Sequence, residues 1–168
     1  MKRSPALMLN ILGLYVIAGV LIAAFAMQFW LSELPCPLCL LQRAFICALA
    51  AGPILNLRYG PRPSHYALSI LAALIGASVS ARQILLHILP GDPGYGSAIL
   101  GYHYYTWAFL LFVAAIGLAS LMLLFDRQFE QDETPRRCVA GTVAVWLVIG
   151  LVAANVISTL AICGVAEC

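Results

Sequence analysis

Cys36 and Cys39 form a Cys-x-x-Cys pair, and Arg43 follows the second cysteine by four residues. Two thiols at this spacing can close a disulfide and exchange it with a thiol of another molecule. Pro37 suits the first turn of a helix and biases the preceding residue towards an extended backbone, so we expect Cys36 at the N-cap and Cys39 in the first turn. The positive end of the helix dipole there favours thiolate over thiol, which makes a disulfide readily reducible.

Arg43 is expected on nearly the same helix face as Cys39, because the two residues are four positions apart. A permanent cation one turn from a sulfur stabilises a thiolate, or a reduced electron acceptor docked beside it. A structural disulfide and one half of a zinc site are the alternatives. A closed zinc site needs four Cys or His ligands, and only Cys163 and Cys168 could supply a second pair. We therefore favour a redox centre and expect no metal.

The composition is that of an integral membrane protein. Of the 168 residues, 63% are hydrophobic and only 10% are charged, against about 25% charged residues in soluble domains. The basic residues are spread among short loops, which does not indicate nucleic-acid binding. Five apolar stretches come close to or exceed the roughly 20 residues that a helix needs to cross a bilayer: about 7–30, 40–57, 67–89, 105–125 and 139–162. We predict a single all-α transmembrane domain, a bundle of five membrane-spanning helices.

The loops predict the orientation of the chain. Nearly all basic residues fall in the N-terminus, the second loop and the fourth loop: Lys2, Arg3, Arg58, Arg62, Arg127, Arg136 and Arg137. The positive-inside rule makes these segments cytoplasmic and places the C-terminus on the other side. Both cysteine pairs then face the oxidising compartment, where disulfides persist.

The first apolar stretch ends near Ala24-Phe25-Ala26, which could also be a secretory cleavage site. Its apolar run is longer than a signal core of about 7–15 residues. We therefore expect a retained helix.

Arg82, Gln83 and His87 lie near the outer end of the third apolar stretch. A charge inside a span is costly unless it reaches the headgroups or faces a polar cavity, and both interpretations of Arg82 stay open. Gln83 and His87 are four residues apart, so they could hydrogen-bond one polar ligand, while His87 could equally be an interfacial histidine. The outer loop that follows is rich in turns and aromatic residues. It favours an interfacial aromatic belt, with a lid over a hydrophobic acceptor as the alternative.

Cys163 and Cys168 lie in a short tail after the fifth apolar stretch, with Gly164 between them. A disulfide between them would constrain very little chain, so it is a poor structural staple. We favour a role in thiol exchange over a passive disulfide.

The segment Cys-Pro-Leu-Cys-Leu-Leu-Gln-Arg at 36–43 resembles the active-site signature of the disulfide bond formation protein B (DsbB) family. The resemblance covers roughly the first four spans. It implies a four-helix core in the bacterial inner membrane that forms disulfides de novo as a thiol:quinone oxidoreductase. Such an enzyme reoxidises a periplasmic thioredoxin-like thiol oxidase similar to DsbA and passes the electrons to quinone, either ubiquinone or menaquinone. The resemblance further implies that Cys36 takes part in disulfide exchange, that Cys39 faces the quinone ring and that Arg43 supports the quinone and the adjacent thiolate.

The end of the third span matches the family less closely. Arg82, Gln83 and His87 resemble the family's quinone-side helix end, which implies that they contact the quinone. Family members also typically have four spans and a second cysteine pair in the loop between the third and fourth. This chain has no cysteine between Cys47 and Cys138. We hypothesise that the tail pair on the fifth span replaces the missing loop pair and passes electrons to the Cys-x-x-Cys pair.

Two further classes of function stay open. A membrane protein that handles a soft metal such as Cu(I) could use the two cysteine pairs with His87 or His103, although no span carries a ladder of Met or His residues. A non-enzymatic assembly protein would contain the same cysteines as passive disulfides.

Overall fold

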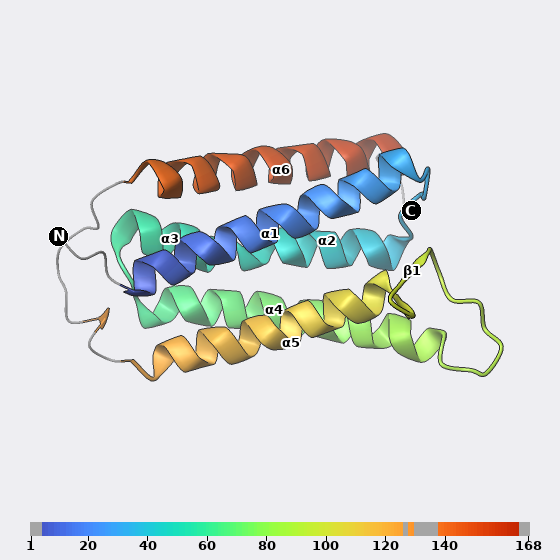
Figure 1. Cartoon of the computed structure of the whole chain (residues 1–168), viewed down its shortest axis with the longest axis horizontal. Helices are drawn as coiled ribbons and strands as arrows, with labels where there is room; N and C mark the ends of the chain where they lie inside the picture. Colours follow the sequence, from blue (N-terminus) through green and yellow to red (C-terminus); the bar gives the residue numbers. More distant parts are fainter. Residues whose placement is uncertain (1–4, 126–127, 130–137, 165–168) are drawn as a thin grey trace.

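A computed structural model of the chain describes residues 5–125, 128–129 and 138–164, which form a bundle of long helices with one short hairpin (Figure 1). Five helical segments in this part of the chain are long and apolar enough to span a membrane. They are Pro5–Trp30, Pro37–Tyr59, Pro63–Leu86, Tyr104–Leu123 and Val139–Cys163. The predicted all-α bundle of five spans is confirmed, and the length and composition of its helices make the chain a multi-pass membrane protein.

Two spans differ from their predicted bounds for local reasons. The second span starts with α2 (Pro37–Leu49), earlier than expected, because Pro37 occupies the first turn and Cys36 caps it. The third span is α4 (Pro63–Leu86), which also starts at a proline and ends before the predicted residue 89. Its C-cap, His87, has φ −116° and ψ 25°, and Pro90 lies close behind it, where a helix is disfavoured.

The second span is divided into α2 and α3 (Ala51–Tyr59), with Ala50 between them. Pro53 has no backbone N–H, so the carbonyl of Leu49 loses the donor that a regular helix would supply. The hydroxyl of Ser69 on α4 donates to this carbonyl at 3.1 Å. The break in the helix therefore also fastens the second span to the third.

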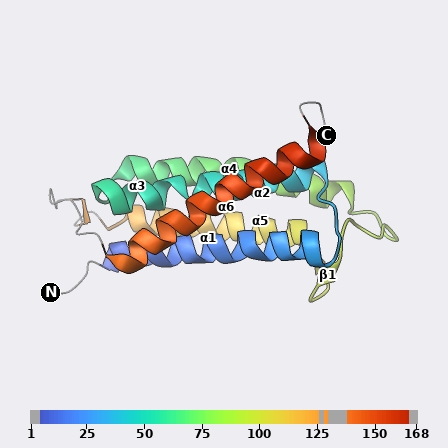
Figure 2. The ribbon, with the colours of Figure 1, turned by 90° about the horizontal axis from the view of Figure 1, so that it is seen from above.

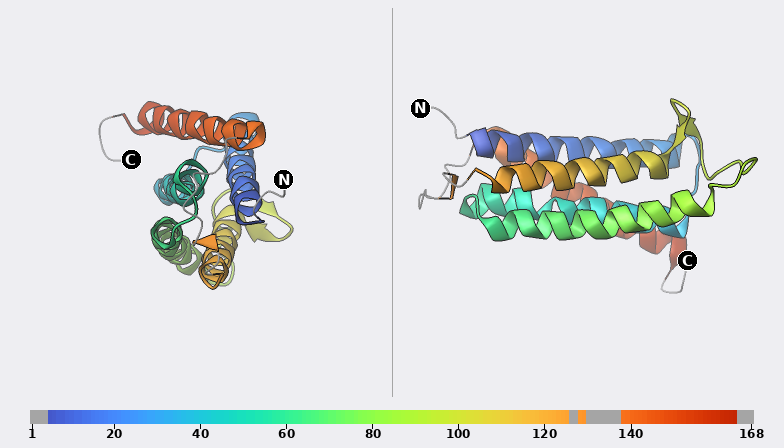
Figure 3. Two further views of the ribbon diagram at one scale, coloured as in Figure 1. Left: turned by 90° about the vertical axis from the view of Figure 1, so that its left-hand side faces the viewer. Right: turned by 90° about the horizontal axis from the view of Figure 1, so that it is seen from below.

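The helices form a four-helix core with a fifth helix outside it. α1 (Pro5–Trp30), α2 with α3, α4 and α5 (Tyr104–Leu123) run side by side, and α6 (Val139–Cys163) crosses them obliquely (Figure 2). The end-on view places α6 at one side of the bundle, and it packs on α1 and α2 (Figure 3). Buried aliphatic residues of α1 and α6 and the ring of Phe112 make up much of the core.

A two-stranded hairpin lies at the end of the bundle where α2 begins. β1 (Ala98–Ile99) pairs antiparallel with β2 (Tyr102–His103). The two turn residues between them, Leu100 and Gly101, have φ values of 53° and 83°, as a two-residue hairpin of the primed type requires. The sequence predicts turns and an aromatic belt here, and the two short strands are not evident from it.

Candidate redox site

Cys36 and Cys39 are joined by a disulfide at the start of α2, with their Cα atoms 4.9 Å apart. Cys36 is the N-cap, with φ −71° and ψ 162°, and its sulfur accepts a hydrogen bond from the N–H of Cys39 at 3.1 Å. The predicted positions of both cysteines in the helix are therefore confirmed. The disulfide sits at the positive end of the helix dipole, which stabilises any thiolate formed when the bond opens.

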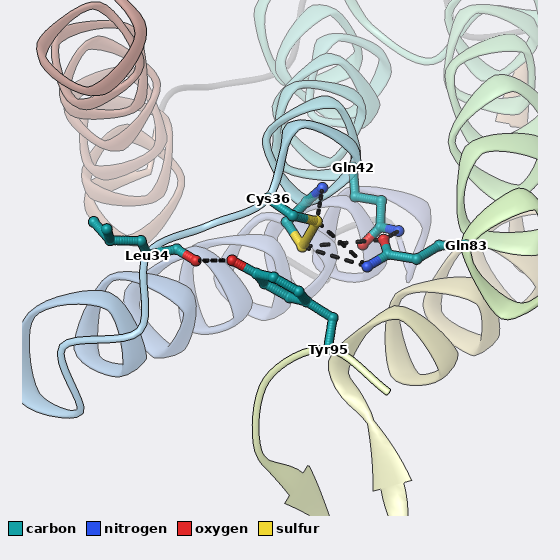
Figure 4. The surroundings of a disulfide bond; sticks show 6 residues. Leu34, Cys36, Gln42, Gln83 and Tyr95 are labelled. Atoms are coloured by element: carbon teal, nitrogen blue, oxygen red, sulfur yellow. Dashed lines mark hydrogen bonds between the residues drawn. A yellow bond between two sulfur atoms is a disulfide. The ribbon is translucent and has the colours of Figure 1, made fainter. Parts of the chain in front are cut away.

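Gln83 of α4 contacts the disulfide, and Gln42 of α2 holds the Gln83 side chain in place (Figure 4). Gln83 is only 1% exposed, and its Nε2 donates to the sulfur of Cys36 at 3.3 Å and to that of Cys39 at 3.6 Å. Gln42 fixes this amide by donating from its own Nε2 to the Gln83 Oε1 at 2.8 Å. Because donors favour the charged form of an acceptor, the Gln83 amide would stabilise negative charge on either sulfur.

Arg43 is buried beside this group, with 6% of its surface exposed. Its Nη1 donates to the Oε1 of Gln28 on α1 at 2.6 Å, and its guanidinium carbon lies 4.3 Å from the centre of the Phe25 ring. The other two nitrogens, Nε and Nη2, are buried without a hydrogen-bond partner among the described residues. A buried donor without a partner is costly, so these two nitrogens keep hydrogen-bonding capacity that a ligand could satisfy.

A cavity of about 530 Å³ joins Cys39 and Arg43. Its volume is in the range of small-molecule sites. Its walls are mainly apolar and include Met27 of α1 and Trp107 of α5, while Tyr95 in the loop before the hairpin closes part of it. The cavity can therefore admit a flat apolar molecule with a polar atom near Arg43.

The loop over the cavity is tied to the segment between α1 and α2. Tyr95 donates its hydroxyl to the carbonyl of Leu34 at 2.6 Å (Figure 4). Glu33 accepts from the N–H of Ser97 at 3.0 Å and also from its hydroxyl. Trp107 donates from its ring nitrogen to the carbonyl of Ile99 in β1 at 3.1 Å. These bonds hold the hairpin region beside the disulfide.

Three predicted site residues on the third span lie in different surroundings. Gln83 contacts both sulfurs, as described above. Arg82 is exposed on the outside of α4, and the cavity lining does not include it. His87 lies beyond the end of the helix, where its Nδ1 is 3.0 Å from the Oδ1 of Asp92 and its ring stacks on Tyr105. The structure thus brings Gln83 to the disulfide and does not bring Arg82 or His87 to the cavity.

Of the two tail cysteines, Cys163 lies within the described residues. Cys163 is the last residue of α6, at the same end of the bundle as the start of α2 (Figure 1). Cys168 lies outside the described residues, so the pairing of Cys163 with Cys168 stays a prediction. The two remaining cysteines, Cys47 in α2 and Cys138 at the start of α6, are free thiols.

Two glutamines and one serine of the site were not assigned a role from the sequence. Gln42 lies within the motif at 36–43 and Gln28 lies near the end of the first apolar stretch, while nothing in the sequence singles out Ser158. A signal existed for Gln28, because a polar side chain inside an apolar span is a functional candidate by default. The contact of Gln28 with Ser158, at 3.0 Å, joins α1 to α6 across 130 positions of sequence and could not be read from local spacing.

Comparisons with known proteins give one consistent family. The family model described as "Disulfide bond formation protein DsbB" matches residues 6–97. A disulfide bond formation protein B of Xanthomonas axonopodis pv. citri is 37% identical over 87 residues, which cover 49% of this chain and 51% of the relative. The protein of the same name from Chromobacterium violaceum is 42% identical over 79 residues, covering 45% of this chain and 48% of the relative.

The matched region is limited in extent. The chain spans about half the length of the curated relatives that it matches. The family match ends before α5, so α5 and α6 lie outside it. No solved structure matches the chain.

Proposed function

We propose, from the premise that this chain belongs to the DsbB family, that it is a membrane thiol:quinone oxidoreductase which makes disulfides and passes the electrons to quinone. The observation that carries the proposal is the shared cavity. Cys39 and Arg43 line the same apolar space, and Arg43 brings to it two buried donors that have no partner among the described residues.

The residues of the cavity fit a quinone. A quinone is flat and apolar with two carbonyl oxygens, and it supplies, when bound, an acceptor for two electrons and two protons. Arg43 would donate to one carbonyl oxygen through Nε or Nη2. Met27 and Trp107 would contact the ring as apolar walls. This arrangement accounts for a permanent cation in a largely apolar site.

The two cysteines differ in their access to the cavity, which suggests different roles. Cys39 lines the cavity and Cys36 does not, although both are partly exposed. An incoming thiolate would attack Cys36, so that a new sulfur–sulfur bond forms to Cys36 and Cys39 leaves as a thiolate. The helix N-terminus and the Gln83 amide stabilise that thiolate.

The cycle closes on the same residues. The second thiol of the incoming dithiol attacks the mixed disulfide, which releases Cys36 and leaves that dithiol oxidised. Cys36 and Cys39 then re-form their disulfide while two electrons leave through Cys39 and two protons leave for the acceptor in the cavity. Arg43 compensates the negative charge that develops there. Each turn converts one dithiol into one disulfide.

The partner and the orientation are part of the proposal. The partner would be a periplasmic thioredoxin-like thiol oxidase, similar to DsbA, reoxidised at the disulfide end of the bundle. The N-terminus would face the cytoplasm of a bacterium and the protein would lie in its inner membrane. The loop charges support this orientation. The partner's dithiol would first reduce the tail pair Cys163–Cys168, and the reduced tail pair would be the dithiol that attacks Cys36–Cys39.

One anaerobic experiment tests the proposal. The purified protein is mixed with a reduced thioredoxin-like dithiol protein and a soluble short-chain quinone, and quinone absorbance is followed. We expect one quinone consumed for each dithiol oxidised. No consumption of quinone by the wild-type protein would refute the enzyme. Normal consumption by Cys163→Ser would refute the relay and leave the oxidoreductase intact.

A further inference from the structure

We propose that Ser158 of the fifth span is a positioning residue for Arg43, acting through the amide of Gln28. The inference rests on the proposed function, because Arg43 matters most if the cavity binds the electron acceptor. It adds a role for α6, which lies outside the region matched by the family model.

The contacts form one chain across three helices. Ser158 on α6 accepts from the Nε2 of Gln28 on α1 at 3.0 Å. The Oε1 of the same amide accepts from the Nη1 of Arg43 on α2 at 2.6 Å. Gln28 is buried and Ser158 is half-buried, so water competes little for the middle of this chain.

The chemistry of the three groups determines which way the amide faces. A guanidinium has only donors, so Gln28 must turn its oxygen towards Arg43. The Gln28 nitrogen must then face the opposite side, where it needs an acceptor. The hydroxyl of Ser158 is that acceptor. Arg43 thus excludes the flipped arrangement, in which two donors would face each other, and Ser158 holds the amide at its other end by accepting from its nitrogen.

Among the described residues, the hydrogen bond to this amide fixes the position of Arg43. The bond to Gln28 is its one hydrogen bond to a described residue, and the contact with the Phe25 ring constrains the plane of the guanidinium. Without the hydroxyl of Ser158, the Gln28 nitrogen loses its acceptor, so the amide is held at one end only and the guanidinium can move along the cavity. An acceptor in the cavity would then meet donors that are no longer preorganised.

The chain offers a matched control on the same helix. Thr159 is the neighbour of Ser158, and its hydroxyl donates to the carbonyl of Asn155 at 2.8 Å, within α6. The variants are therefore Ser158→Ala, Ser158→Thr, which keeps a hydroxyl, and Thr159→Ala. All are compared with the wild type in full-length protein.

The first measurement is quinone kinetics with a soluble short-chain quinone. Ser158→Ala should raise the KM for quinone roughly fivefold, as expected for the loss of one neutral hydrogen bond that orients a binding group. The kcat at saturating quinone should change less. Ser158→Thr should restore the KM, and Thr159→Ala should leave it unchanged. A loss of folding alone would lower the active fraction without raising the KM.

The second measurement does not depend on activity. Arginine residues are labelled with phenylglyoxal, and the rate at each site is read by peptide mass spectrometry. Arg43 should be protected in the wild type and should react several-fold faster in Ser158→Ala, because its Nη1 is freed. The exposed Arg82 serves as the internal reference and should react equally in every variant.

The outcomes separate the inference from the proposed function. Equal Arg43 labelling in the wild type and Ser158→Ala overturns the inference, whatever the kinetics show. An unchanged KM in an active Ser158→Ala protein also overturns it. A wild type that consumes no quinone, with Arg43 still released by Ser158→Ala, refutes the proposed function and supports the link between α6 and Arg43.

Discussion

Two buried polar clusters lie at opposite ends of the same bundle, and they differ in how fully their hydrogen bonds are satisfied. The cluster far from the disulfide is centred on Asn56, which is 0% exposed. Its Nδ2 donates to Asn10 at 2.9 Å, and its Oδ1 accepts from the N–H of Arg62 at 3.2 Å and from His65 at 2.9 Å. Asn10 in turn donates to the hydroxyl of Tyr66 at 3.1 Å.

The cluster at the disulfide end contains Gln28, Gln42, Gln83 and Arg43, and it is incomplete. Its three amides are bonded to one another, to sulfur or to other side chains, yet two donors of Arg43 have no partner among the described residues. This cluster borders a cavity, and the cavity lining includes no residue of the Asn56 cluster. The satisfied buried cluster holds helices together, whereas the unsatisfied cluster beside the cavity keeps hydrogen-bonding capacity for a ligand.

The largest expected effect comes from the two cysteines. Cys36→Ser and Cys39→Ser should each abolish quinone consumption, because neither can form the disulfide. Incubated with a soluble model disulfide, Cys39→Ser should form a mixed disulfide on Cys36, read by peptide mass spectrometry, while Cys36→Ser should form little on Cys39, which lines the cavity. Cys47→Ser is the matched control in the same helix and should remain active. Trapping on Cys39 in place of Cys36 would reverse the assigned roles.

Arg43→Ala should have the next largest effect on activity. It removes a charged donor from the cavity, which corresponds to roughly a 10- to 100-fold fall in kcat/KM for quinone. The thiol exchange between Cys36–Cys39 and the partner should change much less. Arg82→Ala, at an exposed position of α4, is the control and should behave as the wild type. Equal losses in both variants would show that the cavity is not the quinone site.

Asn56→Ala should show the opposite pattern. It leaves several buried groups of the far cluster without partners, which corresponds to a loss of about 3 kcal/mol in the free energy of unfolding. The apparent unfolding midpoint should fall, while the KM for quinone stays constant well below that midpoint. Ser78→Ala, which removes an exposed hydroxyl bonded within α4, should leave the midpoint nearly unchanged. A raised KM in Asn56→Ala would mean that the two clusters are coupled.

The smallest expected effect is a change in hydrogen exchange with pH in the loop that contains Asp92 and Gly94. The N–H of Gly94, followed by the side chain of His87, holds the pKa of Asp92 below its ordinary value of 3.8. Because the pKa of Asp92 is lower in the folded protein, its ionised carboxylate stabilises the loop at pH values above 3.8. This stabilisation is lost as the pH falls through the pKa of the folded state. Hydrogen exchange at Gly94, corrected for its intrinsic rate, should speed up only at strongly acidic pH. Asp92→Asn should remove this pH dependence.

The parts of the fold and site that follow from local spacing could be predicted from the sequence. Hydropathy was sufficient for five spans, and Pro37 was sufficient to place Cys36 at the N-cap, since both depend on neighbouring residues. The pairing of Gln83 with His87 assumed that the helix continued, and it ends at Leu86. The contact between Gln28 and Ser158 depends on how α6 crosses α1, and no periodicity within one helix reports that crossing.

The most direct test of the central claim is photolabelling with an azido-quinone, read by peptide mass spectrometry. Labels should appear on the cavity walls, at Met27 and Trp107; excess unlabelled quinone should remove them and Arg43→Ala should weaken them. Labels confined to the exposed outer face of α6, for instance at Trp146, would contradict the central claim.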